Sequence, residues 1–254
     1  MNPAVSGRIN LYRIVLAFFV IGIHTNYATS QSNGLAFYTS VALDVLYRTA
    51  VPGFFVLTGF LILDTADVTW EYSKKRLRKI LLPWIVWSAI FLIYRVVALE
   101  NHISIFSAIR CFLVGDTYYH LWFMYKLVGL YFVAPILGIF VRSAGLTKVA
   151  TVTLIAYLIN IFCVDICRIL EFFYPFSFQP AIYMTGIDNF VILAMAGWCS
   201  RQIITNPLLK WSTIGTFSLC YVVLVICTMK ISLEQSRLIE TAYYPSLEPV
   251  SKPS

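Results

Sequence analysis

The sequence predicts an all-α protein, a polytopic bundle of transmembrane helices. The first reason is composition: the chain has 254 residues, of which 59% are hydrophobic and only 12% charged, and its mean hydropathy is +0.78. A soluble domain of this size needs far more polar residues to cover its surface. The second reason is that apolar runs of about 20 residues, long enough to cross a bilayer, recur along the chain. Together these observations exclude a soluble globular protein.

Seven apolar runs predict about seven spans, at residues 9–27, 43–63, 80–99, 119–141, 148–164, 189–204 and 211–231. The first run is long enough to span and lacks an A-x-A-like cleavage site, so we expect a retained helix rather than a signal peptide. The sixth run is the shortest. Residues 1–231 are therefore expected to form one transmembrane domain, and the polar, proline-bearing residues 232–254 a tail.

The distribution of basic residues predicts a cytoplasmic N-terminus. With that orientation the outer loops 28–42, 100–118 and 165–188 hold only Arg110 and Arg168. The remaining basic residues near the ends of the spans fall inside, as the positive-inside rule requires: Arg8, Lys74, Lys75, Arg76, Arg78, Lys79, Arg142, Lys148, Arg201 and Lys210. The outer loops could cover a site that opens outward, or lie at headgroup level.

Arg13 and His24 lie within the first span, and eleven residues of helix put them on nearly the same face about 16 Å apart. Ionisable groups inside a membrane are costly and indicate function by default. His24 could be a general base for a hydroxyl, or a histidine that hydrogen-bonds within the bundle. Arg13 could bind an anionic group from the cytoplasm, or extend its side chain to the inner headgroups.

Asp44 and His120 are the other candidates near the outer face. Asp44 is one helical turn from Arg48, so an i, i+4 ion pair is the favoured interpretation. Asp44 could instead orient the imidazole of His24, as carboxylates do in hydrolytic triads. His120 is expected at the outer end of the fourth span, on the same side as His24.

A basic cluster, KKRLRKILLP from Lys74 to Pro83, leads into the third span. Arg76, Arg78 and Lys79 could bind the phosphates of a nucleotide-bearing donor such as coenzyme A. Alternatively, the cluster anchors the helix at the cytoplasmic face and is attracted to anionic lipid. The six cysteines form no C-x-x-C, and we expect no metal site and no required disulfide.

Four motifs in order resemble the acyltransferase 3 family of bacterial membrane enzymes. Arg13 and His24 resemble its R-x10-H signature, and VPGFFVLTGFLI resembles VPxFFxxSGFxx with Thr58 in the serine position. The stretch KRLRKILLP resembles RLxRIxxP, with Arg76 on the first arginine and Lys79 in place of the second. The motif YHLWF, Tyr119 to Phe123, is similar to the branch that contains the enterobacterial common antigen O-acetyltransferase.

This resemblance implies an O-acyltransferase of the bacterial inner membrane. Its donor substrate would be acyl-coenzyme A, with acetyl favoured, and its acceptor a hydroxyl of a surface polysaccharide, such as lipopolysaccharide, or of a lipid-linked precursor. Arg13 and the basic cluster would hold the donor, and His24 would deprotonate the acceptor or assist acyl transfer. Membrane lipid is an expected partner, whereas nucleic acid and a permanently bound cofactor are not.

The chain departs from the family pattern at its C-terminus, because family members usually have about ten spans. A shortened bundle could bury its exposed face against a second copy of the chain. Two alternative functions follow: a transporter or flippase for a glycan precursor, which shares the intramembrane charges but usually shows repeats absent here, and a catalytically inactive, truncated family member.

Overall fold

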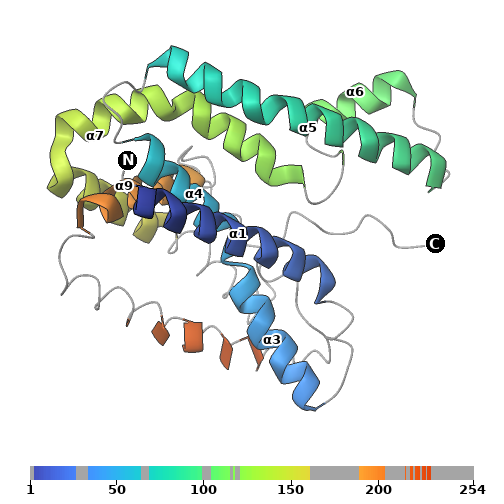
Figure 1. Ribbon diagram of the computed structural model, residues 1–254, viewed down its shortest axis with the longest axis horizontal. Helices are drawn as coiled ribbons and strands as arrows, with labels where there is room; N and C mark the ends of the chain where they lie inside the picture. Colours follow the sequence, from blue (N-terminus) through green and yellow to red (C-terminus); the bar gives the residue numbers. More distant parts are fainter. Residues whose placement is uncertain are drawn as a thin grey trace, which may run out of the picture. The chain divides into compact units, whose positions relative to one another are not determined.

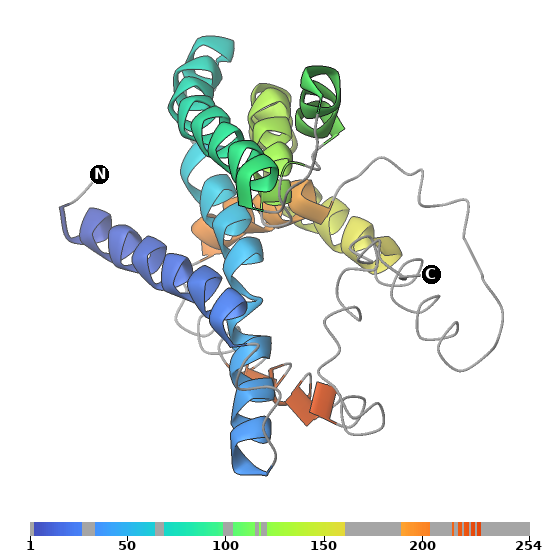
Figure 2. The ribbon, with the colours of Figure 1, turned by 90° about the vertical axis from the view of Figure 1, so that its right-hand side faces the viewer.

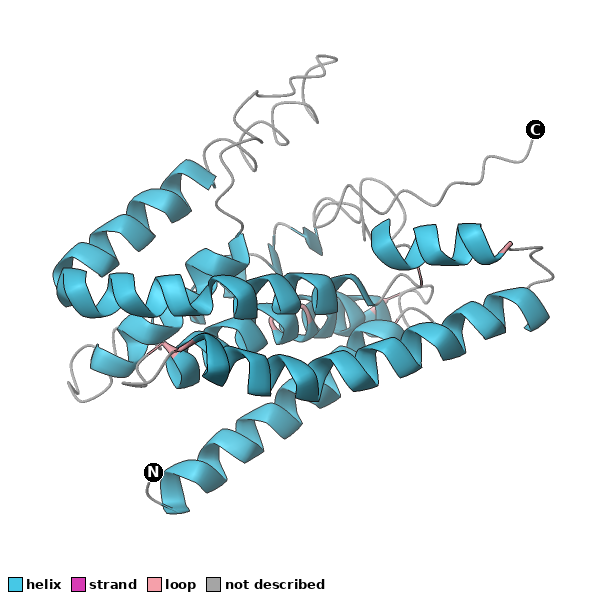
Figure 3. Cartoon of the chain, turned by 90° about the horizontal axis from the view of Figure 1, so that it is seen from above, coloured by secondary structure: helices cyan, strands magenta, loops and turns pink. Residues whose placement is uncertain are grey.

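The computed structural model describes residues 3–26, 34–63, 69–98, 104–114, 117, 121–160 and 189–203, and part of 215–229. Every regular element among these residues is an α-helix, and they contain no strand (Figure 3). The predicted all-α class is confirmed. The chain forms two compact units, one made of Met1–Phe54 with Ile204–Ser254 and the other of Phe55–Ile203.

The first unit contains α1 (Pro3–Thr25), α3 (Leu35–Tyr47) and the first turn of α4 (Ala50–Ile62). Two glycines let these helices approach closely: a Cβ at Gly22 would lie 2.7 Å from the ring of Tyr47, and one at Gly53 would lie 2.8 Å from Leu16. Small residues have this role in membrane bundles, where close backbone approach supplies the packing energy.

The second predicted span begins earlier than expected and is interrupted. Residues 35–42, expected in an outer loop, are helical, because Gly34 starts α3 at a φ of 70° and the apolar sequence continues from Leu35. The helix then breaks at Arg48 and Thr49, where the Thr49 N–H bonds the carbonyl of Leu46 rather than continuing the α pattern. Pro52, which lacks an N–H, falls in the first turn of α4, where none is needed.

The second unit contains the rest of α4 together with α5 (Trp70–Ala98), α6 (Ile105–Val114), α7 (Trp122–Asn160) and α9 (Asn189–Ile203). α5 begins well before the predicted residue 80, and its start is capped by Thr69, whose Oγ1 accepts from the Tyr72 N–H at 3.3 Å. α7 packs against both α5 and α9 (Figures 1 and 2).

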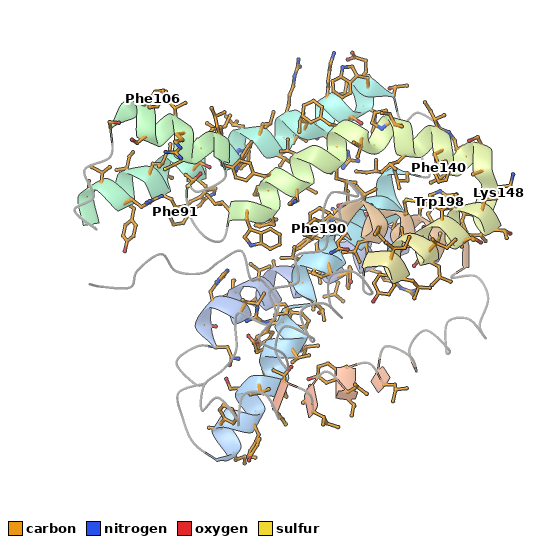
Figure 4. All side chains as sticks on the ribbon, turned by 180° about the vertical axis from the view of Figure 1, so that it is seen from behind. Phe91, Phe106, Phe140, Lys148, Phe190 and Trp198 are labelled. Atoms are coloured by element: carbon orange, nitrogen blue, oxygen red, sulfur yellow. The ribbon has the colours of Figure 1, made fainter. Side chains whose placement is uncertain are left out.

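α7 accounts for the predicted fourth and fifth spans together. Its 39 residues are interrupted at Gly145, whose φ of 74° lies in a region that L side chains avoid. At about 1.5 Å per residue the element is much longer than the roughly 30 Å hydrocarbon core, so it is long enough for two crossings. Figure 4 shows Phe140 and Lys148 on either side of the bend.

Within the part of the chain that the structure describes, four helical stretches are long and apolar enough to cross a membrane: Ser6–Thr25, Leu35–Ile62, Trp70–Val97 and Trp122–Ile159. They confirm the membrane class, while the number of spans and the orientation stay predictions. The sixth predicted span coincides with α9, which has 15 residues, and the seventh lies in the partly described region 211–231. α5 exposes large apolar side chains along most of its length, as lipid contact requires.

α4 and α9 cross at two glycines. A Cβ at Gly59 would overlap the backbone carbonyl of Ala194, and one at Gly197 would overlap the carbonyl of Val56. Beside this crossing, Nη1 of Arg201 donates to the carbonyl of Phe60 at 3.1 Å. The predicted motif VPGFFVLTGFLI therefore includes one side of a close helix contact in the second unit.

Candidate functional site

Arg13 and His24 lie on one uninterrupted helix, α1, so the predicted spacing on a common face is present in the backbone. Both residues are exposed in the described structure. Nη1 of Arg13 lies 3.5 Å from Oδ1 of Asn10, a long contact that leaves most of the guanidinium available to an anion. The helix thus presents a cation and an imidazole along one side of a predicted span.

The C-terminal part of α1 is tied to α3 by contacts on either side of His24. Gly22 meets Tyr47, and the side-chain amide of Asn26 donates to the carbonyl of Ser40 at 2.7 Å. Along α1, His24 lies between Gly22 and Asn26. Along α3, Asp44 lies between their partners Ser40 and Tyr47. The two helices therefore place Asp44 at about the same level as His24.

Asp44 forms the predicted ion pair. Its Oδ2 lies 2.6 Å from Nε of Arg48, and both side chains are largely buried. The i, i+4 interpretation is confirmed. The further idea that Asp44 orients His24 is compatible with their common level and stays a prediction.

The basic cluster occupies the first turns of α5, in the second unit. Arg76, Arg78 and Lys79 are all exposed. Nη2 of Arg76 donates to the hydroxyl of Tyr72 at 3.1 Å, and its guanidinium lies 5.3 Å from the centre of that ring. These contacts orient Arg76 without neutralising it, so the cluster keeps the positive charge that a phosphate would meet.

His120 lies outside the described residues. Of the motif that contains it, Leu121 is buried and Trp122 packs against Phe190 at 5.7 Å between ring centres. Figure 4 shows Phe190 and Trp198 along α9. Among the described residues no group of three histidine, cysteine or acidic side chains could hold a metal ion.

One cluster was not predicted from the sequence. Trp84 of α5 stacks on Phe112 of α6 at 4.9 Å and meets Tyr125 of α7 edge-on at 4.6 Å. The Tyr125 hydroxyl donates to the carbonyl of Phe112 and lies 3.2 Å from Oγ1 of Thr117. The only sequence signal was the recurrence of polar and aromatic residues on one face of α5, directly after the basic cluster.

Comparison with known proteins connects this arrangement to a family. The sequence model described as "Acyltransferase domain", of the acyltransferase 3 family, matches residues 6–247. The chain is 29% identical over 165 residues to an "Amino-acid racemase" of Enterococcus faecalis, covering 60% of this chain and 22% of that protein. It is 32% identical over 102 residues to the "Succinoglycan biosynthesis protein ExoH" of Rhizobium meliloti (strain 1021), covering 37% of this chain and 28% of that protein.

The chain spans less than a third of the length of either curated relative. No solved structure matches it significantly.

Proposed function

Because the chain belongs to the acyltransferase 3 family, we propose that it is a membrane O-acyltransferase that modifies a surface polysaccharide or its lipid-linked precursor. The observation that carries the proposal is the family match over residues 6–247, which includes Arg13 and His24 on α1. The relative named for succinoglycan biosynthesis supports a polysaccharide acceptor. The racemase name belongs to a protein of which this chain matches about a fifth, so it supports no activity here.

The donor we propose is acyl-coenzyme A, with acetyl as the acyl group. Its phosphates would meet Arg13 and the exposed residues Arg76, Arg78 and Lys79, since guanidinium and ammonium groups bind phosphate through charge-assisted hydrogen bonds. In the bacterial inner membrane with a cytoplasmic N-terminus, these residues would face the compartment that holds coenzyme A.

His24 would act at the acceptor. Its neutral imidazole takes the proton from a sugar hydroxyl, the oxygen attacks the thioester carbonyl, and the carbon–sulfur bond breaks to release coenzyme A. The proton held by His24 then returns to the departing thiolate. Asp44 would hold the imidazole in the productive orientation, and His120 would be a second acid or base on the same side.

Labelled acetyl-coenzyme A, mixed with membranes that contain the protein and candidate glycans, tests the proposal. Wild-type protein should label a glycan, and His24→Ala should reduce the rate by about a hundredfold or more. Thr25→Ala is the matched control, because among the described residues its hydroxyl bonds only the carbonyls of Ile21 and Gly22 in its own helix. Absence of glycan labelling by wild-type protein, together with acetyl-independent movement of a lipid-linked glycan, would instead identify a flippase.

A further inference from the structure

The buried face of α5 carries an unusual row of polar groups. Its fully or nearly buried residues are Ser73, Leu77, Trp84 and Ser88, exposed by 1%, 8%, 8% and 0%. Their spacings of four, seven and four residues put them on one side of the helix. This side begins beside the basic cluster and continues along the part of α5 that packs near α6 and α7.

Three hydrogen-bonding atoms on this face have no partner within the described residues: Oγ of Ser73, Nε1 of Trp84 and Oγ of Ser88. The only other such buried side-chain atom in that part of the chain is Nε1 of Trp198 on α9. Buried polar groups are nearly always hydrogen-bonded because leaving one unsatisfied costs free energy. A row of three on one helix face therefore calls for an explanation.

The indole of Trp84 is held in place, while its N–H has no acceptor among the described residues. Phe112 stacks on the ring and Tyr125 meets it edge-on. The hydroxyl of Tyr125 is already engaged with the Phe112 carbonyl and with Thr117. The neighbours thus fix the indole without satisfying it, as in a site prepared for a hydrogen-bond acceptor.

The chemistry of these groups defines the ligand that they fit. A tryptophan N–H only donates, and a serine hydroxyl donates or accepts. Along the helix axis Trp84 is about 8 Å and Ser88 about 14 Å beyond Lys79 of the basic cluster. A matching ligand has phosphate at one end, followed by an extended chain with carbonyl groups along it. The pantetheine arm of coenzyme A, a chain with two amides that leaves a diphosphate, has this pattern.

We propose that the buried face of α5 is a subsite for the amide-bearing arm of the acyl donor, with Trp84 Nε1 and Ser88 Oγ donating hydrogen bonds to its carbonyl oxygens. This inference rests on the proposed function, because it takes acyl-coenzyme A as the donor. It adds two specificity-determining residues that lie outside the four family motifs. It also predicts the direction of the donor, which would extend from the basic cluster along α5 towards Ser88.

Binding of coenzyme A and of adenosine 3′,5′-bisphosphate, which lacks the arm, to the purified full chain in nanodiscs tests the subsite. Trp84→Phe keeps an aromatic ring, although a smaller one, and Ser88→Ala keeps nearly the same side-chain volume. Each removes one hydrogen-bonding group. Each variant should bind coenzyme A about threefold to tenfold more weakly and bind the bisphosphate as wild type does. The melting temperature of Ser88→Ala should not fall, because this variant removes an unsatisfied buried group at almost unchanged volume. The melting temperature of Trp84→Phe should fall, because phenyl is smaller than the nearly buried indole.

Trp198→Phe is the matched control, since it removes the other unpartnered indole N–H and should leave both affinities unchanged. Wild-type affinity for coenzyme A in both Trp84→Phe and Ser88→Ala would overturn the subsite while leaving the proposed function intact. If wild-type protein binds neither ligand, the coenzyme A donor and the subsite both fail. Ser88→Ala decides the question if Trp84→Phe does not fold.

Discussion

Oδ2 of Asp44 lies 2.6 Å from Nε of Arg48, one turn further along the chain, and both side chains are largely buried. The same carboxylate lies at about the level of His24, because Gly22 meets Tyr47 and Asn26 meets Ser40 on either side of it. One acidic residue therefore neutralises a buried arginine within the helix that packs beside the candidate base. Its structural role and its proposed role in the site can be separated by experiment.

Removal of Asp44 should destabilise the protein strongly. Asp44→Ala breaks the largely buried ion pair with Arg48, and breaking such a pair by removing one partner typically costs about 3–5 kcal/mol. Unfolding measured in detergent should show this loss, and replacing both residues by apolar ones of similar size should recover most of it. Glu71→Ala is the control, because the Glu71–Lys74 pair is exposed and should contribute less than about 1 kcal/mol. Equal losses in Asp44→Ala and Glu71→Ala would contradict the prediction.

Arg13→Ala should weaken donor binding with little effect on stability. The guanidinium is exposed and its contact with Asn10 is long, so folding does not depend on it. Loss of a charge-assisted hydrogen bond to phosphate should raise KM for acyl-coenzyme A by about tenfold to a hundredfold. The control is Asn10→Ala, which should change KM little. An unchanged KM in Arg13→Ala, with normal expression, would favour the headgroup-contact interpretation instead.

Bulky residues at the crossing of α4 and α9 should prevent normal packing. At Gly59 and Gly197 even a Cβ would overlap a backbone carbonyl of the other helix, so the helices must move apart to admit a side chain. Gly59→Leu and Gly197→Leu should each cost about 1–3 kcal/mol or more. Gly129→Ala is the control, since no atom of the described residues lies within 4 Å of its Cβ position and alanine favours a helix. Comparable melting temperatures in all three variants would show that these helices do not cross this closely.

The features that could be predicted from the sequence are those that depend on residues close together in the chain. Apolar length predicted the membrane helices, and an i, i+4 spacing predicted the pair of Asp44 and Arg48. The break at Arg48 and Thr49 was missed, because apolar residues on both sides of these two led to one predicted span over 43–63. The bond from the Thr49 N–H to the Leu46 carbonyl marks the break. Likewise, no pattern in α5 alone could show that Phe112 and Tyr125, from two later helices, enclose Trp84. Such contacts join residues far apart in the chain, and one sequence does not record them.

Tyr125→Phe should loosen the attachment of α6 without unfolding the bundle. The hydroxyl of Tyr125 links α7 to the carbonyl of Phe112 and to Thr117, whereas the ring packs on Trp84 and would be retained. Loss of these hydrogen bonds should cost about 1–3 kcal/mol, because a part-buried carbonyl and the hydroxyl of Thr117 lose a partner. Hydrogen exchange should then accelerate in residues 105–114 and stay unchanged in α9. Tyr38→Phe, at an exposed position on α3, is the control and should alter exchange in neither helix. Wild-type protection of α6 in Tyr125→Phe would show that ring packing alone holds it.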